Sequence, residues 1–133
     1  MNEGVGLGRS MTEQLLVRAP LGIPGVFALI LSNQIVNIGA TTGFAFSGRA
    51  ESTGGFVLWQ LVGSVFGLAA QVTFAGLVRL FPLQVANAFG IGLAFVSAQM
   101  FGSFFFFREP FTPTQWLGTA FIFAGILCIS LGR

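Results

Sequence analysis

Four long stretches without a charged side chain constrain this chain more than any other feature of its sequence. The 133 residues contain only six basic and four acidic side chains, and histidine is absent. The uncharged stretches cover about residues 23–46, 55–78, 83–106 and 113–131. A bilayer core of about 30 Å needs about 20 apolar residues in helical form, so each stretch is long enough to span it. We therefore expect an all-α membrane protein whose domain of four transmembrane helices (23–133) follows an N-terminal tail over residues 1–22.

The composition also excludes several classes of function. Charged residues make up 8% of the chain, against about 25% in soluble domains. The arginines are isolated near the ends of the expected helices and do not form the basic patch that a nucleic-acid partner requires. Cys128 is the single cysteine, so neither a disulfide nor a metal-ligand set is expected. Without a nucleophile–base pair or a phosphate-binding loop, we expect no enzyme activity, cofactor or metal.

Short connections set the topology of the expected helices. The connecting segments are "SGRAESTGG" (47–55), "RLFP" (79–82) and "REPFTP" (108–113), and connections this short force neighbouring helices to run antiparallel. The two ends of the chain and the second connection hold four arginines, whereas the first and third connections hold two. This bias predicts that both termini lie in the cytoplasm.

Small residues recur at every fourth position of the third stretch. They are Ala86, Gly90, Ala94, Ala98 and Gly102, and the fourth stretch adds Gly118 and Gly125. Small side chains let helix backbones approach closely in lipid, so these positions are expected to pack helices within the bundle or between subunits. A groove or sliding surface along the same residues is the alternative interpretation.

Uncharged polar residues follow one face of the first stretch. Asn33, Asn37 and Thr41 are spaced i, i+4 and i+8, and Gln71 and Asn87 lie in the second and third stretches. Unsatisfied amides are costly in hydrocarbon, so this face is expected to point inward. Such groups either form interhelical hydrogen bonds, worth about 0.6 kcal/mol each, or line a neutral groove for a substrate.

The segment "LFPLQVANAFGIGLAFVSAQMFGSFFFFREPFTPTQWLGTAFIFAGILCISLG" (80–132) resembles the second half of small multidrug resistance proteins. These belong to the drug/metabolite transporter superfamily, and the resemblance implies a four-helix bundle that works as a dimer, often antiparallel. The family's first helix carries a glutamate followed by a small residue, two threonines and a serine. "NIGATTGFAFS" (37–47) fits this frame with Asn37 in place of the glutamate. An asparagine releases no proton near pH 7, so the family's proton-coupled exchange is not expected of this chain alone.

The segment "REPFTPTQWLGTAFIFAGI" (108–126) is similar to another branch of the superfamily, the EamA-like subunits that flip aminoarabinose-linked undecaprenyl phosphate. In that branch, the start of the fourth helix has a recognisable motif. It reads Glu-Pro, then a Thr or Ser, then Pro, and then Trp-x-Gly-x-Ala-Phe-Ile. The resemblance implies a bacterial inner-membrane location, a membrane lipid as ligand, and assembly with similar four-helix subunits.

Together these patterns favour a transporter or flippase subunit that moves an amphipathic substrate, for example a polyprenyl-phosphate-linked lipid. Arg108 and Glu109 are expected at the mouth of the groove. The residues expected to bind the substrate are Asn33, Asn37, Thr41, Gln71, Asn87 and Gly90. Two alternatives stay open: a scaffold subunit of a larger respiratory or photosynthetic membrane complex, and a multidrug or cation exporter whose partner chain supplies the missing acid.

Overall fold

The computed structural model describes residues 22–132 of the protein, which form four long helical spans. The expected tail over residues 1–22 therefore lies, except for Gly22, outside the described residues. All four spans are long and apolar enough to cross a membrane, which confirms the all-α, four-helix membrane fold. The elements are α2 (Gly22–Gly48), α3 (Thr53–Leu80), α4 (Leu83–Asn87), η1 (Ala88–Gly92), α5 (Leu93–Ser97), η2 (Ala98–Phe106) and α6 (Pro113–Leu131).

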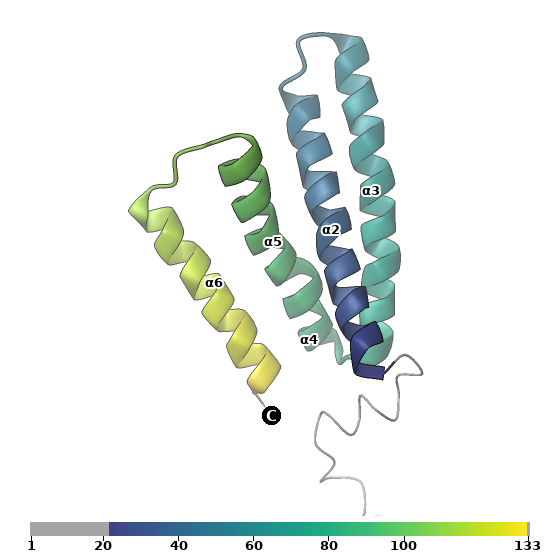
Figure 1. Ribbon diagram of the computed structural model, residues 1–133, viewed down its shortest axis with the longest axis vertical. Coiled ribbons are helices and arrows are strands. Elements are labelled where there is room, and N and C mark those ends of the chain that lie inside the picture. Colours follow the sequence, from purple (N-terminus) through teal and green to yellow (C-terminus); the bar gives the residue numbers. More distant parts are fainter. Residues whose placement is uncertain (1–21, 133) are drawn as a thin grey trace, which may run out of the picture.

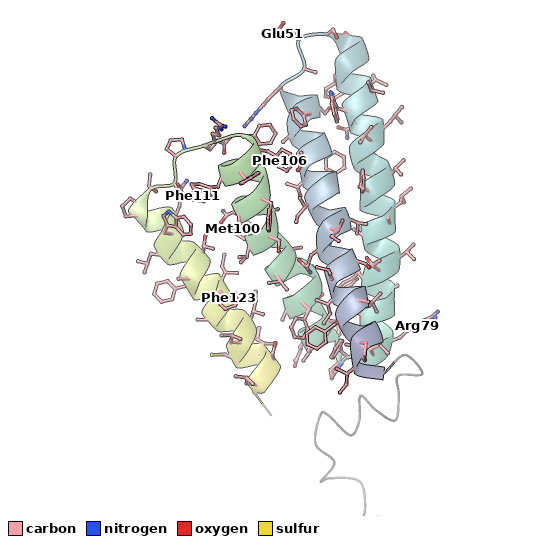
Figure 2. The ribbon with its side chains drawn as sticks, viewed as in Figure 1. Glu51, Arg79, Met100, Phe106, Phe111 and Phe123 are labelled. Atoms are coloured by element: carbon pink, nitrogen blue, oxygen red, sulfur yellow. The ribbon has the colours of Figure 1, made fainter. Side chains whose placement is uncertain are left out.

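The helices are arranged as two antiparallel hairpins (Figure 1). α2 and α3 form the first, and the second consists of α6 and the continuous helix Leu83–Phe106, which we call the third helix. The third helix lies between α2 and α6. Figure 2 shows Glu51 and Phe106 toward one end of the bundle and Arg79 at the other.

Capping residues in the sequence explain where two of these helices, α3 and α6, begin. Ser52 caps α3 by accepting a hydrogen bond from the backbone N–H of Gly55 at 3.1 Å. Thr112 and Gln115 form a capping box at the start of α6, and Pro113 follows at a position where its missing N–H costs no hydrogen bond. Polar side chains thus satisfy one backbone donor at the start of α3 and two at the start of α6.

The third helix departs from α geometry in two segments, η1 and η2, which are π-helical. The sequence pattern did not predict them, because small residues at every fourth position are compatible with an α-helix throughout. π-helical turns often occur at functional sites because they shift the faces on which side chains lie. Two residues after the end of η2, Arg108 has a left-handed conformation (φ 50°), and the backbone N–H of Glu109 then bonds to the carbonyl of Ser103 at 3.0 Å.

Close backbone contact joins α2 to α3. A Cβ atom added to Gly43 would lie 2.8 Å from both the Cα and the N of Gly63. At the opposite end of the hairpin, the fully buried Leu77 packs with Val26, Phe81 and other apolar residues into the main core cluster. Small residues therefore bring the two helices together at one end, and large residues fill the space at the other.

The small residues of the third helix lie largely on its packed side. Ala86, Gly90, Ala94 and Gly102 are buried, and Ala98 is half-buried. On α6, by contrast, a Cβ added to Gly118 or Gly125 would meet nothing within 4 Å. Within residues 22–132, these two glycines do not pack against another helix, so their role in an oligomer stays a prediction.

Candidate functional site

Two of the membrane-depth amides hold helices together. Asn33 is fully buried, and its Nδ2 donates to the Ala70 carbonyl at 3.2 Å and to Thr73 Oγ1 at 2.8 Å, both on α3. Gln34 is 6% exposed and binds the third helix, donating to the Phe89 carbonyl at 2.9 Å and accepting from Ser97 at 3.3 Å. These side chains form interhelical hydrogen bonds that connect α2 to both of its neighbours.

Asn37 has different contacts, although it lies one turn further along the same helix. Its Nδ2 donates to the backbone carbonyl of Asn33 at 2.8 Å and to Asn33 Oδ1 at 3.1 Å. Both acceptors belong to α2. Within residues 22–132, no group donates to Asn37 Oδ1. The Asn37 side chain therefore connects no two helices.

Asn37 lines a groove between α2 and the third helix, with a volume of about 450 Å³. Its polar lining is Asn37 and Thr41 from α2 and Gln99 and Ser103 from η2. Small and apolar residues complete the wall: Gly90, Ile91, Ala94, Phe95 and Ala98. No ionisable side chain belongs to this lining, so the groove is polar but electrically neutral.

The groove follows the third helix over much of the membrane thickness. Gly90 and Ser103, the outermost lining residues on that helix, are 13 positions apart. At a rise of 1.5 Å per residue or less, they are separated by at most about 20 Å. This length is about two thirds of a hydrocarbon core of about 30 Å. Asn37, near the middle of α2, lies within that depth.

Gly90 also brings the third helix close to α3. A Cβ at this position would lie 2.4 Å from Phe74 Cδ2, which is too short for any real contact. A larger residue at position 90 therefore requires Phe74 to move.

Charged residues lie beyond the Ser103 end of the groove. The backbone bond from Glu109 to Ser103 ties the loop that follows η2 to this end. Glu109 forms an ion pair with Arg49, whose guanidinium also lies 3.8 Å from the centre of the Phe107 ring. This pair connects the loop after α2 to the loop before α6.

A separate hollow of about 380 Å³ adjoins the same loop. Its lining includes both residues expected at the groove mouth, Arg108 and Glu109. Phe104, Phe105 and Pro110 complete the lining. Charged and aromatic side chains therefore meet at this end of the third helix.

The structure brings together only part of the predicted binding set. Asn37, Thr41 and Gly90 line the groove. Asn33 does not, because its amide is buried and bonded to α3. Gln71 and Asn87 are exposed side chains outside the groove lining, each next to a buried alanine that occupies the packed face of its helix.

Two groove residues were absent from the predicted binding set. Gln99 and Ser103 lie on η2 and face the groove opposite α2. Their spacing of four residues matches that of Asn37 and Thr41, and this shared spacing is the signal that identifies them. Gln99 is also held by α6, since Thr119 Oγ1 donates to its Oε1 at 2.8 Å.

The fold and the groove define a multi-pass membrane protein with a neutral polar groove between its helices. Neither a family model, nor a curated protein, nor a solved structure matches the chain.

Proposed function

We propose that the protein is a transporter or flippase subunit that moves an amphipathic substrate along the groove between α2 and the third helix. The headgroup occupies the lining around Asn37, Thr41, Gln99 and Ser103 while the hydrophobic tail stays in the lipid. A polyprenyl-phosphate-linked lipid is the example implied by the sequence resemblance. In this proposal the groove lies in a bacterial inner-membrane protein with both termini in the cytoplasm.

One observation carries this proposal: Asn37 is a membrane-depth amide without an interhelical hydrogen bond. Asn33 and Gln34 account for the bonds that α2 makes through amides to its neighbours. A polar side chain at this depth costs free energy and commonly marks a substrate pathway. Since Asn37 lines the groove and joins no helices, a substrate contact explains why it is there.

Arg108 supports a role for the mouth in binding. It occupies the left-handed position just after the C-cap of η2, where glycine is usually found because a Cβ costs about 1–2 kcal/mol there. Its exposed guanidinium lines the hollow next to Glu109. In the proposal, this arginine meets the charged part of the headgroup before the neutral part enters the groove.

The neutrality of the groove favours a flippase over a proton-coupled exporter. A proton-coupled step requires a group that titrates at membrane depth, and the groove lining contains none. A partner subunit of similar four-helix architecture, or a larger membrane complex, provides any driving force beyond the lipid gradient itself.

A flipping assay in liposomes tests the proposal. The protein is reconstituted with a fluorescent undecaprenyl-phosphate-linked sugar, and a membrane-impermeant reductant then quenches the label that reaches the outer leaflet. We expect wild-type protein to accelerate quenching over empty liposomes and Asn37→Leu to abolish the acceleration. Gln84→Leu is the matched control, because it replaces an exposed amide of the third helix outside the groove lining with the same residue.

Three outcomes separate the proposal from its rivals. Equal quenching by wild-type protein and empty liposomes contradicts autonomous flipping. If Asn37→Leu and Gln84→Leu reduce the acceleration of quenching equally, the effect does not come from the groove. Assembly of the purified native protein into a larger complex that fails with Asn37→Leu favours the scaffold role instead.

A further inference from the structure

The orientation of the Asn37 amide is fixed by a chain of hydrogen bonds that begins on α3. A backbone carbonyl only accepts hydrogen bonds, so the Ala70 carbonyl, 3.2 Å from Asn33, must face the Asn33 NH₂ group. The second hydrogen of that group goes to Thr73 Oγ1, whose own proton is directed at the carbonyls of Ala69 and Ala70. Asn33 Oδ1 therefore has to point away from α3, toward Asn37.

The same logic fixes the next amide. Asn37 faces two acceptors of Asn33, the backbone carbonyl at 2.8 Å and Oδ1 at 3.1 Å. Only its NH₂ group can donate to both. If the amide were turned by 180°, Asn37 Oδ1 would face the two Asn33 oxygens, and none of the three could donate. With both hydrogens engaged, Asn37 offers the groove its carbonyl oxygen alone.

Gln99 adds a second amide from the other wall of the groove. Thr119 Oγ1 lies 2.8 Å from Gln99 Oε1 and 2.9 Å from the Gln115 carbonyl, so its single proton has two acceptors and does not fix which end of the Gln99 amide faces the groove. The Asn37 carbonyl oxygen is therefore the group whose orientation the hydrogen bonds define. A neutral group that donates a hydrogen bond, such as a hydroxyl or a primary or secondary amide, matches it.

We infer that Asn33 acts as a positioning residue which orients Asn37, so that the groove selects an uncharged headgroup carrying hydroxyl or amide N–H donors. This inference rests on the proposed function and specifies the chemistry of its substrate. A fully ionised phosphate has no donor for Asn37 Oδ1, so it stays outside this part of the groove. The donor-bearing portion of an amphiphile enters instead.

A matched pair of amphiphiles tests the selectivity. Dodecyl glucoside and its tetra-O-methyl ether share a tail and a ring, but only the first carries hydroxyl donors. Occupancy is read from the maleimide labelling rate of a groove cysteine, Ala98→Cys, in a Cys128→Ser background in lipid nanodiscs. Concentrations are expressed as mole fractions in the bilayer, because the two compounds partition differently.

We expect the ether to protect the groove cysteine with about threefold to tenfold weaker affinity than the glucoside, the cost of one unsatisfied hydrogen bond. Adding Asn37→Leu should abolish this difference, whereas adding Gln84→Leu should preserve it. Melting temperatures of all variants establish that they are folded.

The amide orientation has a test that needs no ligand. In protein labelled with ¹⁵N at asparagine, the Asn37 NH₂ protons should exchange slowly with water, since both are bonded to Asn33. Their signal is assigned by its loss in Asn37→Leu. Exchange as fast as that of a free asparagine amide in water overturns the orientation argument.

The possible results distinguish this inference from the function on which it rests. Equal protection by the two amphiphiles overturns the donor selectivity and leaves the groove as a binding site. Protection by neither amphiphile contradicts both the selectivity and substrate binding in the groove.

Discussion

Replacing Gly43 with alanine should destabilise the protein through a backbone clash between α2 and α3. The new Cβ would lie 2.8 Å from Gly63 Cα, whereas an ordinary contact begins at 3.4 Å, so the helices must separate by about 0.6 Å. Overpacking of this kind costs about 1–3 kcal/mol. Alanine also returns about 1 kcal/mol through its higher helix propensity, so the net loss of unfolding free energy is about 0–2 kcal/mol.

Gly118→Ala is the control that isolates the clash. It makes the same chemical change in α6, where a Cβ meets nothing within 4 Å, so only the propensity gain remains. The unfolding free energies of the two variants, measured by denaturant titration in mixed micelles, should differ by the clash itself, about 1–3 kcal/mol. Equal stability of Gly43→Ala and Gly118→Ala would refute the close approach of α2 and α3.

Three further predictions concern the hydrogen bonds, the ion pair and the neutral groove. Gln34→Ala should lower the unfolding free energy by about 1–3 kcal/mol, because it removes the hydrogen bonds of Gln34 to the Ser97 hydroxyl and to the half-buried Phe89 carbonyl; an unchanged melting curve would contradict this. Arg49 and Glu109 are about half exposed, so a double-mutant cycle should give a coupling below about 1 kcal/mol that decreases with salt, and a larger, salt-independent coupling would argue for a desolvated pair. Expression in a drug-sensitive host should leave tolerance of quaternary ammonium compounds unchanged, because the Asn37 side chain cannot ionise near pH 7. Proton-coupled uptake of such a compound by liposomes that contain this protein alone would disprove the prediction.

The membrane fold could be predicted from the sequence because charge and length determine it. An uncharged stretch such as 83–106 crosses the bilayer as a helix whatever its neighbours are, since its backbone groups have no other way to form hydrogen bonds. The observed third span covers the same residues. Its π-helical segments were not predicted, because the spacing of its small residues is equally compatible with an α-helix throughout.

The site was only partly predictable, for a different reason. Asn33, Gln34 and Asn37 are chemically alike, and their sequence spacing places them on neighbouring faces without saying which one meets a helix and which one a groove. That distinction depends on the partners Ala70, Phe89 and Gln99, which come from other helices.

The most direct test of this account compares Asn37→Leu with Asn33→Leu. For each purified variant, the melting temperature and the bound lipids, identified by mass spectrometry, are measured together. Asn37→Leu should lower the melting temperature less than Asn33→Leu does and should lose the groove lipid, because it removes only bonds within α2 and leaves Gln34 Nε2, at 3.5 Å, as a donor to Asn33 Oδ1. Asn33→Leu should melt at a lower temperature, because it removes the bonds to α3. A folded Asn37→Leu protein that retains the wild-type lipid complement would contradict the groove as the binding site.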